Sequence, residues 1–115
     1  MDKLEKTIRE EAKIQIIAEQ EEIRIRGNCL ASGDDAEDEL AAVEIERQLN
    51  AGNVWAWAAV EVSASWGGLT ASDYLGACSY EGEAGFIAGG YYEEMRESAL
   101  NDLIEQARRV ARAAV

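Results

Sequence analysis

Apolar and polar positions alternate most regularly between Val54 and Trp66. Every second residue of this stretch is apolar, namely Val54, Ala56, Ala58, Val60, Val62, Ala64 and Trp66. Because successive side chains on a strand point to opposite faces, this pattern predicts a strand with one fully buried face. The other row starts with Trp55 and Trp57, so we expect helices to cover that end. Alanine is frequent here and favours helix, and a buried helix over 54–65 is therefore the alternative.

The glycine pair that follows this run predicts a tight turn. Gly67-Gly68 supplies the positive φ angles that a two-residue hairpin connection needs. The next run, from Leu69 to Tyr80, alternates less cleanly. We therefore predict an antiparallel hairpin at about 53–80, a stretch that contains all three tryptophans, and expect the rest of the chain to pack on it.

Charged residues with isoleucines between them dominate residues 2–26, for which we predict a long N-terminal helix. At 100° per residue, its apolar residues fall on two faces. One face carries Leu4, Ile8, Ile14, Ala18 and Ile25, and the other carries Ile16 and Ile23. An extended conformation is the alternative for residues 22–26, where isoleucines and charges alternate.

A helix that is apolar on two sides needs two partners. It lies either between two layers of its own chain or against a second subunit, and we favour the subunit. The prediction is a homodimer in which two hairpins pair edge to edge, because a lone two-stranded hairpin is marginal in water. Ile16 and Ile23 then line the interface. The competing prediction is a monomer in which residues 23–26 add a third strand.

A second helix is predicted to begin after Ser32-Gly33-Asp34, where an N-cap residue leads into an acidic run. The run comprises Asp34, Asp35, Glu37, Asp38 and Glu39. It suggests a metal site or a mimic of nucleic-acid phosphates. Acids also gather in a first turn because the helix dipole stabilises them, and we prefer this explanation since the calcium-loop pattern is absent. The predicted apolar side of this helix is Ala36, Leu40, Val43 and Leu49.

Four glycines make residues 81–90 a glycine-rich loop, with at most one turn of helix around 84–87. It matches no phosphate-binding pattern, and we interpret it as a structural connection rather than as a mobile binding loop. A C-terminal amphipathic helix is predicted at about 91–113. Its stripe at spacings of three and four is Tyr92, Met95, Ala99, Leu103, Ala107, Val110 and Ala114.

Length and composition indicate a single α+β domain over residues 1–115, large enough to bury a core without a metal or a disulfide. The chain has no histidine, which removes the usual general base and the commonest zinc ligand. Cys29 and Cys78 are not spaced as a metal or redox pair, and neither Cys78 nor Asp73 has a visible partner base. We therefore predict a protein that is not an enzyme and that holds no cofactor and no metal.

The formal net charge of −12 is unevenly distributed along the chain. Residues 27–52 carry seven acidic groups and one basic group, and no lysine or arginine lies between Arg47 and Arg96. Such a surface disfavours nucleic acids and anionic membranes, and it favours a partner protein with a basic surface. The absence of a signal peptide and of a long apolar run predicts a protein of a reducing cytoplasm.

Four strings occur in order along most of the chain: RGNCLASGDDAEDE (26–39), GNVWAWAAVEVSASW (52–66), DYLGACSY (73–80) and GGYYEEM (89–95). Together they resemble a family of small uncharacterised proteins encoded in tailed-bacteriophage genomes. That family has no assigned activity, so the resemblance transfers no functional residue. It implies a phage or prophage origin, and hence action in the cytoplasm of a bacterial host. Small acidic phage proteins without catalytic motifs are often accessory products, including inhibitors of host defence.

Three function classes follow from these observations. We favour a binding inhibitor that occupies a basic surface of a host defence protein, such as a CRISPR effector or a nuclease. The alternatives are a protein that sequesters a small signalling nucleotide between aromatic rings, and a structural or assembly factor whose aromatic residues are all core. The candidate partner-binding residues are Asp34, Asp35, Glu37, Asp38, Trp55, Trp57 and Tyr74.

Overall fold

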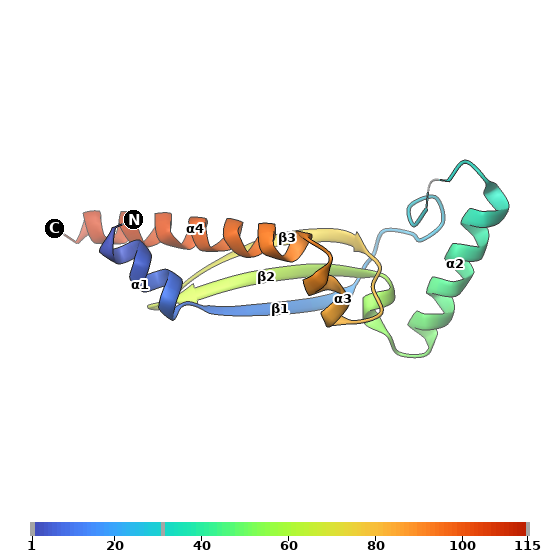
Figure 1. The fold of residues 1–115 in the computed structure, drawn as a ribbon, viewed down its shortest axis with the longest axis horizontal. Coiled ribbons are helices and arrows are strands. Elements are labelled where there is room, and N and C mark those ends of the chain that lie inside the picture. The colour runs from blue at the N-terminus through green and yellow to red at the C-terminus, as the bar shows by residue number, and fades with distance from the viewer. Residues whose placement is uncertain (1, 31, 115) are drawn as a thin grey trace. The chain divides into compact units, whose positions relative to one another are not determined.

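The computed structural model describes residues 2–30 and 32–114 and has the predicted α+β class (Figure 1). These residues form four α-helices, a short 3₁₀-helix and a three-stranded antiparallel sheet. The elements are α1 (Lys3–Glu11), β1 (Lys13–Gln20), α2 (Asp35–Asn50), η1 (Val54–Ala56), β2 (Ala58–Trp66), β3 (Leu69–Cys78), α3 (Glu83–Ala88) and α4 (Tyr91–Ala113). The C-terminal helix has the predicted bounds.

The hairpin of β2 and β3 confirms the prediction made from the alternating rows. Gly67 and Gly68 form its turn with φ angles of +57° and +82°, the combination that a tight two-residue connection requires. Val60, Val62 and Ala64 are fully buried, as the apolar row of β2 predicted. The first part of that row is not strand, however, because Val54–Ala56 forms η1, with the Asn53 side chain accepting a hydrogen bond from the Trp55 amide.

The long N-terminal helix predicted for residues 2–26 is wrong. The helix α1 ends at Glu11, and the extended Ala12 leads into β1, which is the third strand of the sheet and lies beside β2. The physical reason is the spacing of Ile14 and Ile16. Two positions apart, they are 200° apart on a helix but share one face of a strand, and β-branched residues suit a strand. The apparent second apolar face of a helix was therefore a strand pattern.

This strand also changes the predicted dimer. Since β1 occupies the edge of β2, two hairpins do not pair through β2. The predicted third strand at residues 23–26 is also wrong, because the added strand is Lys13–Gln20.

The chain divides into two compact units, and each of the three strands contributes residues to both. Unit 1 comprises Met1–Ile17, Glu61–Tyr74 and Gly90–Val115, and unit 2 comprises Ala18–Val60 and Leu75–Gly89.

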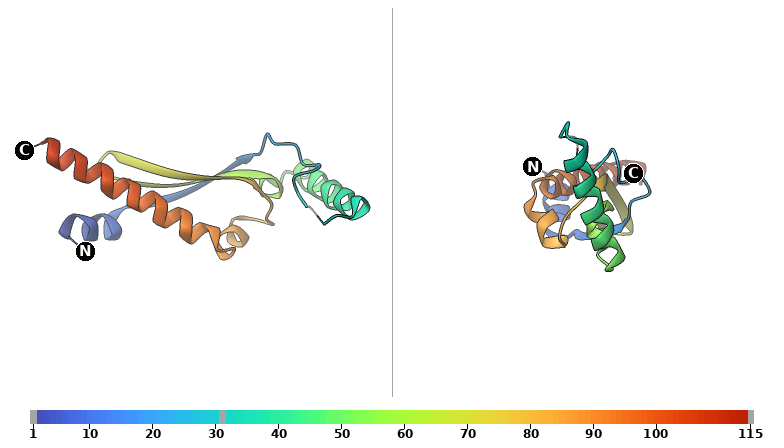
Figure 2. Two further views of the ribbon diagram at one scale, coloured as in Figure 1. Left: turned by 90° about the horizontal axis from the view of Figure 1, so that it is seen from above. Right: turned by 90° about the vertical axis from the view of Figure 1, so that its right-hand side faces the viewer.

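The core of unit 1 forms where α4 packs on the sheet. Ala64 and Ala71 meet the buried residues of α4, namely Ala99, Leu100, Leu103, Ile104 and Ala107, together with Ile8 of α1. Four residues of the predicted α4 stripe, Met95, Ala99, Leu103 and Ala107, are buried, whereas Val110 is exposed. The helix α1 packs against α4 (Figure 2). Arg9 reinforces this contact, since it donates to Glu97 at 2.8 Å and to Asn101 at 2.9 Å.

The core of unit 2 is aromatic. Phe86 of α3 is fully buried, and its ring centroid lies 5.5 Å from that of Trp55 and 5.7 Å from that of Tyr80. Trp57 is 1% exposed and donates from Nε1 to the carbonyl oxygen of Ile23 at 2.6 Å. As predicted from the sequence, both rings at the start of the second row are packed against the protein.

The glycines of the loop at 81–90 make this packing possible. A Cβ added at Gly89 would lie 3.2 Å from the ring of Tyr80, so a larger residue would push this ring away by a few tenths of an ångström. The single turn of helix predicted at 84–87 is α3.

We expect Trp57→Ala to lower the free energy of unfolding by about 3–5 kcal/mol, because it removes a fully buried ring and leaves the Ile23 carbonyl without its donor. Trp55→Ala is the matched comparison and should cost less, since the Trp55 side chain is only partly buried. Urea denaturation followed by circular dichroism measures both. Equal midpoints for Trp57→Ala and the parent protein would contradict the burial of this ring.

Candidate partner-binding surface

Most of the negative charge of the protein belongs to unit 2. This unit has twelve acidic and three basic residues, a net charge of −9, whereas unit 1 has eleven acidic and eight basic residues, a net charge of −3. Two of the basic residues in unit 2 are committed to ion pairs. Arg26 pairs with Glu39 and Glu46, and Arg47 pairs with Glu44. Unit 2 is therefore the more acidic part of the protein.

The predicted acidic cluster lies at the start of α2, and two of its members stabilise the helix. Asp34 is the N-cap, and its carboxylate accepts from the Ala36 amide at 2.9 Å and from the Glu37 amide at 3.3 Å. Asp38 accepts from the Ser32 hydroxyl at 2.8 Å. This arrangement agrees with the preferred explanation that the acids favour the helix start. Asp35 and Glu37 are exposed.

The apolar side predicted for α2 is not its buried side. Ala42 is the one buried residue of this helix, while Leu40 is 72% exposed and Val43 is 48% exposed. The reason is a contact distant in sequence. The guanidinium group of Arg26 binds Glu39 and Glu46 on one side of α2. Ile45 and Gln48 line a hollow on another side. The face with Leu40 and Val43 is left in solvent.

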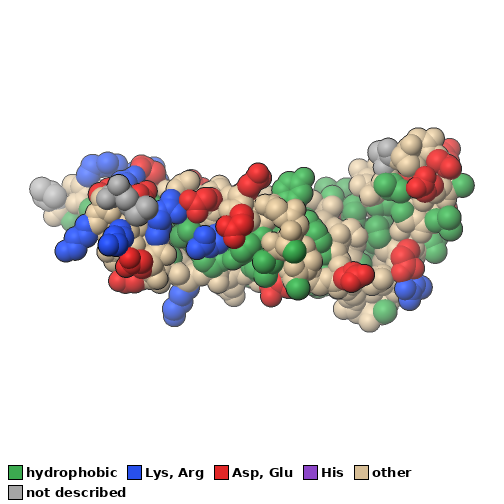
Figure 3. Space-filling view, in the orientation of Figure 1, with side chains coloured by type: hydrophobic (Ala, Val, Ile, Leu, Met, Phe, Trp, Pro, Cys, Tyr) green, Lys and Arg blue, Asp and Glu red, His purple; other side chains and the backbone are tan. Residues whose placement is uncertain are grey.

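Ala36, Leu40 and Val43 therefore form an outward apolar stripe, which we call the α2 stripe. They fall within about 60° of one another on a helix, with Glu37 and Glu44 on one side and Asp35 and Glu39 on the other. Figure 3 shows hydrophobic and acidic side chains next to each other over α2. An exposed apolar row with acidic borders is a typical helix surface for binding a partner.

The aromatic candidates do not join this surface. Trp57 is buried, and the Trp55 ring packs on Phe86, so neither is an open stacking platform. Tyr74 is 70% exposed but belongs to unit 1, where its hydroxyl donates to Glu61 at 2.8 Å. The structure thus brings the four acids together at the start of α2. The two tryptophans instead pack inside unit 2.

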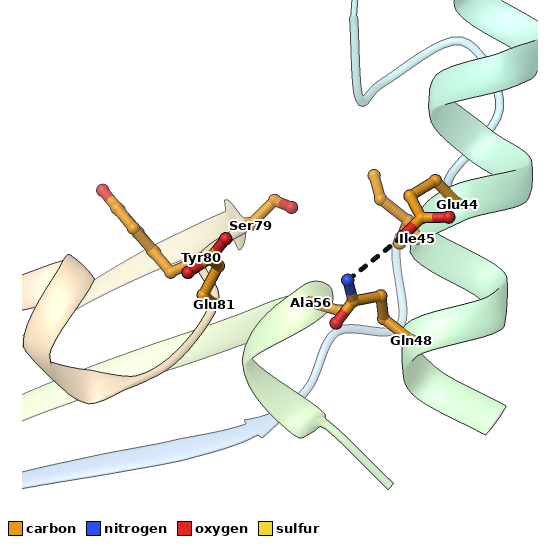
Figure 4. A pocket seen from close by; sticks show the side chains of 7 residues that line it. All are labelled: Glu44, Ile45, Gln48, Ala56, Ser79, Tyr80 and Glu81. Carbon is orange, nitrogen blue, oxygen red and sulfur yellow. Dashed lines mark hydrogen bonds between the residues drawn. The ribbon is translucent and has the colours of Figure 1, made fainter. Parts of the chain in front are cut away.

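A small hollow of about 180 Å³ lies in unit 2 beside α2 (Figure 4). It is lined by Glu44, Ile45, Gln48, Ala56, Ser79, Tyr80 and Glu81. The Gln48 amide donates to Glu44 at 3.2 Å, and the Asn53 amide donates to the Gln48 side chain at 3.2 Å. This volume is smaller than the roughly 300–1,000 Å³ of pockets for small molecules, and its carboxylates repel phosphates.

The Glu44 carboxyl has a strongly perturbed pKa. Hydrogen bonds from Arg47 at 2.6 and 2.9 Å, and then the bond from Gln48, lower its pKa to about 2. Glu44 and Arg47 thus form an ion pair beside the α2 stripe.

Cys78 is buried, and Cys29 is partly buried. Burial, followed by the charge of Glu21, raises the pKa of the Cys78 thiol, which disfavours a reactive thiolate. Within residues 2–30 and 32–114, no three cysteine, aspartate or glutamate side chains converge in the way that a metal ion requires. No helix in this part of the chain has both the length and the apolar character needed to cross a membrane.

Comparisons with protein-family models, with curated proteins and with solved structures find no match to this chain.

We expect the Glu44 carboxyl to titrate near pH 2 and Arg47→Gln to raise its pKa toward the usual 4.5, because the substitution removes the guanidinium that holds the charged form. Since the folded-state pKa lies below the unfolded value, these bonds favour the folded protein above pH 4.5. Their contribution disappears as the pH falls from 4.5 to 2. NMR titration of side-chain carboxyl carbons measures both pKa values, and a Glu44 pKa near 4.5 in the parent protein would refute the predicted interaction.

Proposed function

We propose that this chain is a small acidic phage accessory protein that inhibits a bacterial defence protein by covering its basic nucleic-acid-binding surface. The observation that carries the proposal is the α2 stripe, an exposed apolar row bordered by acids in a unit of net charge −9. The phage origin rests on the resemblance of the four sequence strings.

The α2 stripe suits the helix-in-groove mode of protein recognition. Leu40 and Val43 lie one turn apart on α2, and burying both in an apolar groove supplies binding energy. The bordering carboxylates of Asp35 and Glu37 then face lysines or arginines at the rim of that groove, since Glu39 and Glu44 are already paired with Arg26 and Arg47. Opposite charges raise the association rate and fix the orientation of the complex. A nuclease surface that binds nucleic acid has this basic character.

Two alternatives have less support. A protein that sequesters a nucleotide between aromatic rings needs open rings, whereas Trp57 is buried and the Trp55 ring packs on Phe86. A structural or assembly factor would also use the α2 stripe, and activity against a defence system distinguishes it from an inhibitor.

We expect the protein, expressed in a bacterium with an active defence nuclease, to restore plaque formation by a sensitive phage. The double variant Leu40→Ser with Val43→Ser should weaken its inhibition of DNA binding by the purified nuclease at least tenfold, because it removes the apolar anchors. The matched control is Val110→Ser in unit 1, where Val110 is 54% exposed, between Val43 and Leu40, and this variant should inhibit like the parent protein.

A second variant tests the charge. Asp35→Lys with Glu37→Lys reverses two exposed acids and leaves the capping residues Asp34 and Asp38 in place. Reduced inhibition that is most evident at low salt would support the electrostatic contact. Full inhibition by both folded double variants would show that α2 is not the binding surface.

A further inference from the structure

The sheet has two outer strands, and among residues 2–30 and 32–114 no strand lies along the outer edge of β1 (Figure 1). The Glu21 amide donates to the Trp57 carbonyl at 3.0 Å, so odd-numbered residues at this end bond to β2. Burial alternates along β1 without interruption from Lys13 to Ala18. The odd-numbered residues therefore bond to β2 along the whole strand. Antiparallel strands alternate between inward and outward backbone groups. The amides and carbonyls of Ile14, Ile16 and Ala18 therefore point away from β2.

The outer edge of β3 is different, because side chains occupy it. Gln106 of α4 donates to the Thr70 carbonyl at 3.0 Å, and the Asp73 carboxylate accepts from the Tyr74 amide at 2.9 Å. No described side chain forms such a bond with the outward groups of Ile14, Ile16 or Ala18. An eight-residue strand with an unpaired edge is a template for another strand.

We propose that β1 pairs antiparallel with β1 of a second copy, about a two-fold axis at Ile16. Ile16 then faces Ile16 of the second copy, and Ile14 faces Ala18 on either side of the axis. Each of these pairs exchanges two main-chain hydrogen bonds, since all three residues have their outward groups free. The two three-stranded sheets become one sheet of six strands.

The side chains of β1 explain why the second strand is a copy of the first. In this register Lys13 lies directly opposite Glu19 of the second copy, and the two-fold axis repeats the pair. Both side chains are exposed in the single chain. Ile17, which is 36% exposed, lies opposite Gln15 of the second copy. The methylene groups of that glutamine cover part of the Ile17 side chain. A shift of two residues leaves Glu19 beyond the paired region, or it puts Glu19 opposite Gln15 and Lys13 opposite Glu21. Since the Glu21 carboxylate already accepts from the Ala77 amide at 2.9 Å, the Lys13–Glu19 pair favours the register centred on Ile16.

The first test is the mass of the full chain in solution by light scattering across micromolar concentrations. The proposal requires twice 12.6 kDa, and a mass of 12.6 kDa at every concentration would overturn it. Ile16→Pro removes an outward amide at the two-fold axis without cutting a bond to β2, and it should give a monomer. The matched control is Ser72→Pro, which removes an outward amide at the β3 edge and should leave the dimer intact. An Ile16→Pro variant that folds and stays dimeric would place the interface elsewhere.

The register is tested separately by a charge exchange, which does not depend on the proline variant folding. Lys13→Glu places two glutamates opposite each other twice in the dimer and should raise its dissociation constant about tenfold. Lys13→Glu combined with Glu19→Lys should restore the parent value. Failure of the double variant to recover would overturn the register.

Amide hydrogen exchange provides the direct measurement. In the dimer the amides of Ile14, Ile16 and Ala18 should exchange slowly, and in the Lys13→Glu variant at a concentration where it is monomeric they should exchange quickly. Equal exchange in both would refute the pairing. None of these variants alters α2, so the outcome is independent of the proposed inhibition.

Discussion

Burial of the apolar row of β2 is the interaction on which the rest of the structure depends. Val60, Val62 and Ala64 are fully buried on one face of a strand that has neighbours on both sides. Burying a valine side chain is worth about 1.5–3 kcal/mol, and the two valines together contribute a substantial part of a typical folding free energy. Both units share this strand. Loss of its register would turn the whole row to the polar face and remove its buried side chains from both units.

The sequence predicted correctly those elements that have both a regular hydrophobic period and a clear residue signal at their ends. The α4 stripe repeats at three and four residues over six turns, and Gly67-Gly68 defines a turn by backbone conformation alone. The failure at residues 12–20 has a physical cause, because Leu4 and Ile8 begin a helical period that Ile14 and Ala18 appear to continue. Extended pairing with β2, a contact between residues distant in sequence, decides between the two structures.

For the candidate surface on α2, the sequence predicted the acidic residues but not the exposed apolar row. Acids at the start of a helix are visible in the sequence, whereas the exposure of Leu40 depends on Arg26, which binds the flank of α2 from a segment 13 residues before Glu39. A similar long-range contact holds the end of β3. Ala77 has a φ of +53°, an unfavourable conformation for alanine, and its amide donates to the Glu21 carboxylate at 2.9 Å. No local pattern marks either position.

The two proposed surfaces have complementary consequences. Each copy contributes one α2 stripe, and a two-fold dimer through β1 therefore carries two. A partner that presents two basic sites would then bind the dimer with an avidity above that of a single site, provided that both sites are within reach. Two features limit further growth of such a dimer. Side chains already bond to the outer edge of β3, and each copy adds a net charge of −12, which repels further copies. Pairing through β1 consumes the open edge and ends the assembly at two copies.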